Sequence, residues 1–163
     1  MQYNCKFKST GLAWLWVTII VLAIDRITKY LALEYLPPYS PVPIFPHFNL
    51  TLAYNTGAAF SFLGKASGWQ IWFFGAIALI VSIGILCWLY KLSSKNRWLS
   101  IALTLVVGGA LGNLLDRFLY AHVIDFLEFY AGNWYWPAFN IADSAICVGA
   151  FMLLIDAIFF KKK

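Results

Sequence analysis

The sequence predicts an all-α membrane protein with four transmembrane helices, on the evidence of its composition and of four long apolar runs. Of its 163 residues, 62% are hydrophobic and only 12% are charged, which leaves too little polar surface to cover a soluble globule of this size. The runs cover about Leu12–Leu33, Trp69–Tyr90, Trp98–Leu115 and Ile141–Phe160. Each is close to the ~20 residues that a helix needs to cross ~30 Å of hydrocarbon. Four such helices make one bundle, so residues 1–163 are expected to form a single integral membrane domain.

Basic residues predict how the helices are oriented. The formal net charge of +5 could suggest a nucleic-acid partner, but eight of the 12 basic residues lie at one set of helix ends. They are Lys6, Lys8, Lys91, Lys95, Arg97, Lys161, Lys162 and Lys163. Lysine and arginine concentrate on the cytoplasmic side of membrane proteins. The basic excess is therefore explained by topology, no nucleic-acid partner is expected, and both termini should be cytoplasmic.

The two loops on the other side, residues 34–68 and 116–139, predict a small β-sheet on the outer surface. Apolar and polar residues alternate along Phe48–Tyr54, which is typical of a half-buried strand, and a second short strand is expected near Asp125. Open sheet edges are not tolerated in hydrocarbon, so the sheet should lie in the interface or against the helices. Residues 58–63 are expected to form a short interfacial helix.

Asp125 and Asp143 form the candidate catalytic site. Both carboxyl groups flank an apolar run, and the predicted topology puts them on the same side of the membrane. Two carboxyl groups in a poorly hydrated site cannot comfortably both ionise, so one can act as an acid and the other as a base. A purely structural alternative is equally good for Asn140–Asp143 taken alone, because Asn140 could cap the last helix with Asp143 in its first turn.

Other polar residues at membrane depth have structural interpretations. Asp25 and Lys29 are four residues apart and could form an ion pair that also tethers neighbouring helices. The glycines of Gly108–Arg117 suit close helix packing, while Asn113 and Arg117 share one helix face and offer hydrogen-bond donors at the depth of Asp143. Cys87 and Cys147 are interpreted as small core hydrophobes, and neither histidine nor acid spacing predicts a metal site.

Two non-catalytic functions compete with a hydrolase. A small channel or transporter would distribute ionisable residues through the membrane depth, whereas here they gather at the outer end of the helices. A binding module for lipidated helices would use the acidic residues only for structure. Cleavage of a lipidated precursor by the purified protein would discriminate between these alternatives.

Five motifs, in order along nearly the whole chain, resemble those of the lipoprotein signal peptidases, also called signal peptidase II. They are Asp25–Lys29, Asn55–Phe60, Gly108–Arg117, Val123–Phe126 and Pro137–Ser144. The resemblance implies an aspartyl endopeptidase of the bacterial inner membrane that removes signal peptides from prolipoproteins, cutting before a diacylglyceryl-modified cysteine. The family fold it implies is four helices with a small outer sheet that cradles the substrate.

The resemblance also assigns expected roles to individual residues. Asp125 and Asp143 match the catalytic pair of the family. Positions that line the substrate site or contact inhibitors are matched by Asn55, Gly57, Asn113, Arg117 and Asn140. Supporting positions are matched by Asp25, Lys29 and Asp116. Neither a metal nor another cofactor is expected, and the expected partners of a monomeric enzyme are lipid-modified prolipoproteins, membrane lipids and inhibitory peptide antibiotics.

Overall fold

A computed structural model describes residues 9–57 and 68–159. Its helices are α1 (Leu15–Tyr35), α2 (Trp69–Lys91), α3 (Arg97–Tyr120) and α4 (Ile141–Phe159), and a short 3₁₀ helix, Gly11–Trp14, leads into α1. All four are long and apolar enough to cross a membrane, which confirms the predicted fold class. The short helix expected over residues 58–63 lies outside the described residues.

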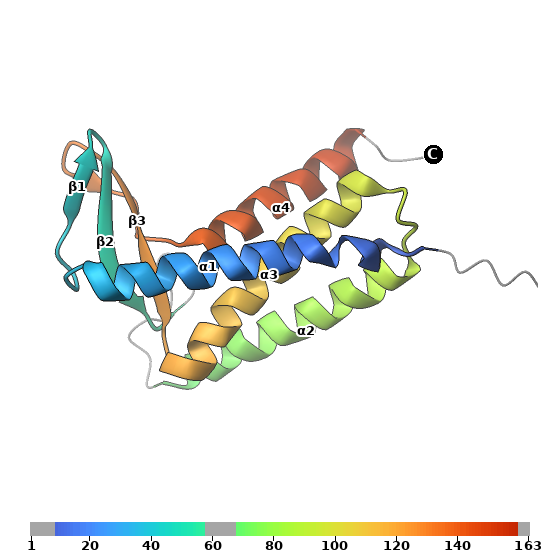
Figure 1. Ribbon diagram of the computed structural model, residues 1–163, viewed down its shortest axis with the longest axis horizontal. Helices are drawn as coiled ribbons and strands as arrows, with labels where there is room; N and C mark the ends of the chain where they lie inside the picture. The colour runs from blue at the N-terminus through green and yellow to red at the C-terminus, as the bar shows by residue number, and fades with distance from the viewer. Residues whose placement is uncertain (1–8, 58–67, 160–163) are drawn as a thin grey trace, which may run out of the picture.

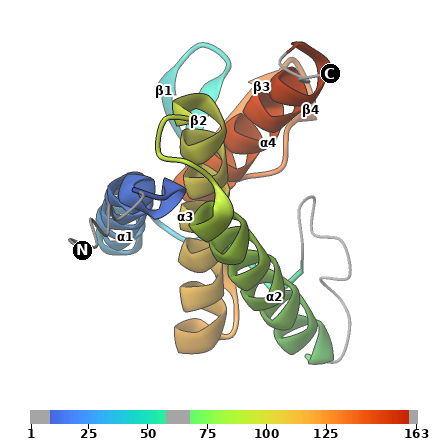
Figure 2. The same cartoon turned by 90° about the vertical axis from the view of Figure 1, so that its right-hand side faces the viewer.

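Helix α3 is the central element of the bundle. It packs against α1, α2 and α4. Of the 18 residues in its apolar stretch, 56% are buried, against 28% or less in the corresponding stretches of the other helices. Figure 2, which looks along the bundle, shows α3 between its three neighbours. The helix continues to Tyr120, beyond the expected end near Leu115, and ends at Ala121 in a left-handed conformation (φ 61°). Asp116 and Arg117 consequently lie on the helix.

Glycines allow α3 and α4 to approach closely, as predicted for the glycine-rich end of α3. A β-carbon added at Gly109 would lie 2.2 Å from the backbone oxygen of Ala142 in α4. One added at Gly149 would lie 2.7 Å from the backbone oxygen of Ala102 in α3. Contact at this range leaves no room for a side chain, so the two helix backbones pack directly against each other.

A four-stranded antiparallel sheet stands at one end of the helices (Figure 1). Its strands follow the order β1 (Val42–Phe45), β2 (Phe48–Asn55), β3 (Val123–Ala131) and β4 (Trp134–Tyr135). The strand predicted from the alternation in Phe48–Tyr54 is therefore confirmed as most of β2. Pro43 is accommodated because β1 is an edge strand, where a missing N–H breaks no ladder between two neighbours.

The sheet is anchored to α1 by a small apolar core. Leu52 of β2, Ile124 and Phe126 of β3, and Ala32 of α1 are all buried together. In the register of the sheet, Ala53 pairs with Asp125 and Asn55 pairs with Val123. The ends of β2 and β3 that lie nearest the helices thus place Asn55 and Asp125 beside the beginning of α4.

Candidate active site

The structure brings Asp125 and Asp143 together through two asparagine side chains. Asp125 lies on β3 and is 1% exposed, and Asp143 lies in the first turn of α4. Nδ2 of Asn140 donates to Asp125 Oδ1 at 2.7 Å, and Nδ2 of Asn113 donates to Asp143 Oδ1 at 2.7 Å. The two amides are themselves joined, because Asn140 Nδ2 also donates to Asn113 Oδ1 at 3.1 Å. A continuous chain of hydrogen bonds therefore connects the two carboxyl groups.

Asn140 also begins α4 in the way that its sequence suggested. Its Oδ1 accepts from the backbone N–H of Asp143 at 2.9 Å, while its own backbone N–H donates to Asp143 Oδ2 at 3.3 Å. This reciprocal arrangement is that of a capping box, with asparagine and aspartate in the roles of serine and glutamate. The capping interpretation and the site interpretation of these residues are thus compatible, because the same side chains serve both.

Asn55, at the end of β2, supplies a second amide donor to Asp125. Its Nδ2 lies 3.1 Å from Asp125 Oδ2, so both oxygens of this carboxyl group accept from asparagine. The Oδ1 atom of Asn55 accepts from the backbone N–H of Gly57 at 2.9 Å. The turn that follows β2 is therefore fastened to the carboxyl group on the neighbouring strand.

Arg117, on α3, contacts the turn that follows β2. Its Nη2 donates to the backbone oxygen of Gly57 at 2.9 Å, and its Nη1 donates to the backbone oxygen of Asn113 at 3.2 Å. The guanidinium also lies 5.8 Å from the ring centroid of Phe74 on α2. Its buried Nε has no hydrogen-bond partner within residues 9–57 and 68–159. Arg117 also lines the cleft described below, so its guanidinium lies within reach of a bound molecule.

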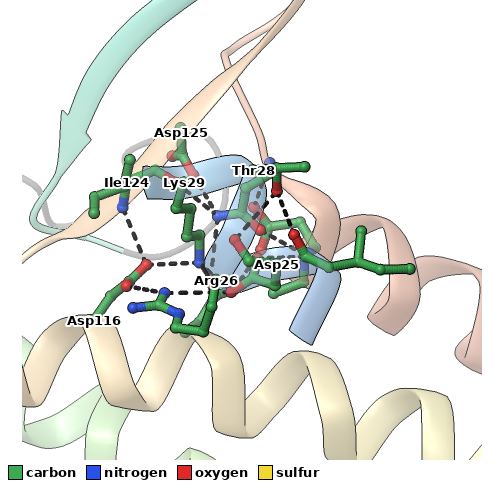
Figure 3. A network of polar contacts seen from close by, with 12 residues as sticks. Asp25, Arg26, Thr28, Lys29, Asp116, Ile124 and Asp125 are labelled. Atoms are coloured by element: carbon green, nitrogen blue, oxygen red, sulfur yellow. Dashed lines mark hydrogen bonds and ion pairs between the residues drawn. The ribbon is translucent and has the colours of Figure 1, made fainter. Parts of the chain in front are cut away.

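A network of four charged side chains, three of them buried, joins α1 to α3 (Figure 3). Lys29 Nζ lies 2.9 Å from Asp25 Oδ2 and 2.6 Å from Asp116 Oδ2, and Arg26 contacts both of these aspartates. The ion pair predicted between Asp25 and Lys29 is therefore present. Arg26 was absent from the predicted site residues, although its position inside the Asp25–Lys29 motif is the signal that could have included it.

The charge network fixes the backbone next to each candidate catalytic residue. Asp25 Oδ1 accepts from the backbone N–H of Ala142 at 3.0 Å, and Asp116 Oδ2 accepts from that of Ile124 at 3.3 Å. Ala142 directly precedes Asp143, and Ile124 directly precedes Asp125. The network thus ties helices α1 and α3 to both segments that carry the acids.

A cleft of about 630 Å³ opens beside Asp143. Asn55, Asn113 and Arg117 join Asp143 among the polar residues that line it, and most of its other walls are apolar side chains of α2, α3 and α4. The apolar walls include Phe74, Ile77, Val106, Phe139 and Ile146. A polar group that carries a scissile bond could meet Asp143 at one end while an apolar segment occupies the rest.

Cys147 lines this cleft, and both it and Cys87 are exposed. The interpretation of these cysteines as core residues was therefore wrong. In a membrane protein the outer surfaces of the helices are as apolar as the interior, so hydrophobicity alone does not identify the core. Within the described ranges, no three histidine, cysteine or acidic side chains lie close enough together to hold a metal ion.

Burial determines the protonation of Asp125. Loss of hydration raises the pKa of its carboxyl group to about 7, and the negative charge of Asp143 acts in the same direction. The amide donors of Asn55 and Asn140 and the charge of Lys29 oppose the increase. Asp125 can therefore hold a proton near neutral pH, which suits a group that must act as an acid.

Comparisons with known proteins agree on one family. A family model described as signal peptidase (SPase) II matches residues 17–159. A lipoprotein signal peptidase of Photorhabdus laumondii is 50% identical over 94% of this chain and 92% of its own, and one from Pseudomonas syringae is 53% identical over 93% and 88%. A solved structure described as a bacterial membrane enzyme superposes with a TM-score of 0.80 at 30% identity over 96% of each chain. These similarities favour a peptidase over a channel or a binding module.

Proposed function

The chain belongs to the signal peptidase II family, and from this membership and the geometry of the site we propose that it is an aspartyl endopeptidase that uses Asp125 and Asp143. Its substrates are lipid-modified prolipoproteins, and it cuts on the N-terminal side of the lipidated cysteine. It works as a monomer in the bacterial inner membrane with its site near the periplasmic face. One observation carries the proposal: Asp143 lies at the polar end of an apolar cleft, and hydrogen bonds through two asparagine amides connect it to buried Asp125.

The cleft suits a substrate of this kind. Its apolar walls between α2, α3 and α4 fit the hydrophobic segment of a signal peptide and the adjoining acyl chains. The guanidinium of Arg117, which lines the cleft, and the turn at Gly57 hold the substrate backbone beside Asp143. Peptide antibiotics that imitate this backbone occupy the same donors.

The chemistry follows from the unequal environments of the acids. Asp125 carries the proton, because burial raises its pKa, and donates a hydrogen bond to the scissile carbonyl oxygen. Asp143, ionised, accepts a proton from a water molecule while the water oxygen bonds to the carbonyl carbon. When the tetrahedral intermediate collapses, the C–N bond breaks and the proton on Asp143 passes to the leaving amine. The pair then returns to its starting protonation, without a cofactor.

Replacing either acid by asparagine tests the pair. Asp125→Asn and Asp143→Asn keep the side-chain size but remove the acid or base, so both should abolish cleavage of a lipidated precursor by purified protein. Asp156→Asn is the matched control, because Asp156 lies on the same helix α4 near its other end and outside the cleft-lining residues. Near-normal turnover in either site variant would exclude the pair. The effects of the two site variants should also be non-additive, because each acid works only with the other.

Chelation tests the absence of a metal separately. If the two aspartates act directly on water and carbonyl, extensive treatment with EDTA should leave the cleavage rate unchanged. Loss of activity that zinc or manganese restores would instead assign the carboxylates to a metal.

A further inference from the structure

Lys29 of α1 is buried at membrane depth, and every one of its protons has an acceptor. The side chain is 1% exposed. An ammonium group has three N–H donors and no acceptor, and Nζ of Lys29 has three oxygens in reach. They are Asp116 Oδ2 at 2.6 Å, Asp25 Oδ2 at 2.9 Å and Asn113 Oδ1 at 3.1 Å. Two of these acceptors are the charges that Lys29 neutralises (Figure 3), but the third is a neutral amide.

The contact with Asn113 determines which end of that amide faces Asp143. An asparagine side chain has a donor end and an acceptor end, and turning it by 180° exchanges them. Because Lys29 can only donate, it requires Oδ1 of Asn113 on its own side. Nδ2 of Asn113 then lies 2.7 Å from Asp143 Oδ1. The opposite orientation would place N–H groups against the ammonium and a carbonyl oxygen against the carboxylate.

Asn140 also donates to Asn113 Oδ1, but this bond is shared. The amide group of Asn140 has two protons and three acceptors, namely Asp125 Oδ1 at 2.7 Å, Asn113 Oδ1 at 3.1 Å and the backbone oxygen of Ile124 at 3.2 Å. The shortest of the three bonds goes to Asp125. Lys29, with one proton for each acceptor, is therefore the donor that fixes the orientation of Asn113.

We infer that Lys29 is a positioning residue that acts through Asn113, by keeping an N–H of this amide directed at Asp143 and so holding the carboxylate that activates water. The inference rests on the proposed function of Asp143. Two simpler roles compete with it. Lys29 could serve only to neutralise Asp25 and Asp116, or its charge could act directly on the two candidate catalytic acids. Neither of these roles requires Asn113, and this difference provides the test.

The variant must remove the donor without leaving a buried charge unpaired. Lys29→Met alone would leave Asp25 and Asp116 with Arg26 as the one cation of the network, which could prevent folding. Lys29→Met combined with Asp116→Asn keeps the network neutral, and the asparagine oxygen can still accept from the backbone N–H of Ile124. The reference for this double variant is Asp116→Asn alone, in which Lys29 keeps its ion pair with Asp25 and the surplus charge belongs to Arg26, whose side chain is 27% exposed. Each of these two proteins is then prepared with Asn113 and with Asn113→Ala, and kcat is measured at saturating concentrations of a lipidated precursor.

With Asn113 present, loss of Lys29 should lower kcat about tenfold or more, whereas in the Asn113→Ala background it should change kcat less than about twofold. The pH dependence gives a second readout. Asp143 faces Lys29 from α1, Arg117 from α3 and Asp125 from β3, and the charge of Lys29 also acts on it directly. Loss of Lys29 should therefore move the acid side of the profile to higher pH in both backgrounds, and further where Asn113 is present to lose its directed N–H. Equal losses of kcat in both backgrounds, or no loss in either, would overturn the inference. Failure of the catalytic pair itself would appear separately, as turnover by Asp143→Asn.

Discussion

The side-chain nitrogen of Asn140 lies 2.7 Å from Asp125 Oδ1, so the residue that starts α4 also holds the carboxyl group of β3. Asn140 is fully buried, and its Oδ1 accepts a hydrogen bond from the backbone N–H of Asp143. Backbone groups cannot exchange donor for acceptor, so this contact fixes which end of the Asn140 amide faces Asp125. One capping residue thereby sets the relation between two acids on different elements.

The pKa of Asp125 predicts how cleavage depends on pH. Burial and the charge of Asp143 raise this pKa to about 7. If protonated Asp125 polarises the scissile carbonyl, kcat/KM should fall as pH rises through about 7, approaching tenfold per pH unit on the alkaline side. Asn55→Ala removes a donor that favours the ionised form, so the fall should begin at higher pH in this variant. Initial rates between about pH 5.5 and 9, with the folded fraction checked at each pH, would give the profiles of the wild type and of Asn55→Ala. A flat profile through neutrality would contradict the role of Asp125.

The sequence was sufficient to predict the helices, the strand at Phe48–Tyr54 and the meeting of Asp125 with Asp143. Apolar runs of membrane length and period-two alternation are local patterns, and an even number of crossings leaves both acids on one side. Edge strand β1 was not predicted, since the prolines around it suggested only the absence of a helix. The end of α3 at Tyr120 was also missed, because the predicted span followed the apolar run and stopped near Leu115, although the shared helix face of Asn113 and Arg117 already required helix as far as Arg117.

The hydrogen-bond chain through the site could not be predicted from sequence patterns. The bond from Lys29 to Asn113 joins α1 to α3, and that from Asn140 to Asp125 joins the start of α4 to β3. Such contacts depend on how helices and strands pack in three dimensions, and spacing along the chain carries no information about them. Cys147 is a different case: its place four residues after Asp143 put it on the same helix face, but its apolar surroundings in the sequence favoured a buried thiol over a residue that lines the cleft.

Gly109 should be intolerant of even the smallest side chain. A β-carbon there would meet the backbone oxygen of Ala142 at 2.2 Å, next to Asp143. Gly109→Ala should therefore push α4 away from α3, lower the unfolding free energy by about 1–3 kcal/mol and reduce cleavage. Gly84→Ala is the matched control, because Gly84 is an exposed helical position whose added β-carbon would meet no described atom within 4 Å. Melting temperatures in one detergent would compare them, and equal values for the two variants would contradict direct backbone packing.

Reporter fusions can test which side of the membrane each loop and terminus occupies. Lys91, Lys95 and Arg97 flank the connection between α2 and α3, so fusions after Tyr90 and after Lys163 should report the cytoplasm. A reporter inserted at Gly132, in the turn between β3 and β4, should report the opposite side. Insertions that retain activity are the informative ones, because they preserve the fold. A cytoplasmic signal at Gly132 would contradict a site near the periplasmic face.

A role of Arg117 in substrate binding requires the geometry of its guanidinium group, whereas a purely stabilising role requires only its positive charge. Its planar group holds the backbone oxygens of Gly57 and Asn113 at once and lines the cleft. Lysine keeps the charge but replaces this rigid fork with one ammonium. We expect Arg117→Lys to fold with a melting temperature near that of the wild type and to lose about tenfold in kcat/KM, equivalent to ~1.4 kcal/mol of transition-state binding. Inhibitory peptides held by the same group should weaken in parallel.

The control for this substitution lies on the same helix. Arg97→Lys makes the same chemical change at the first residue of α3, which is exposed and lies far from the cleft. It should leave kcat/KM and inhibitor affinity unchanged, so any loss shared by both variants would reflect helix stability and not the site. Unimpaired cleavage and inhibitor binding in Arg117→Lys would show that its charge alone is required. Loss of activity with an unchanged melting temperature, absent from Arg97→Lys, would place the guanidinium in contact with substrate.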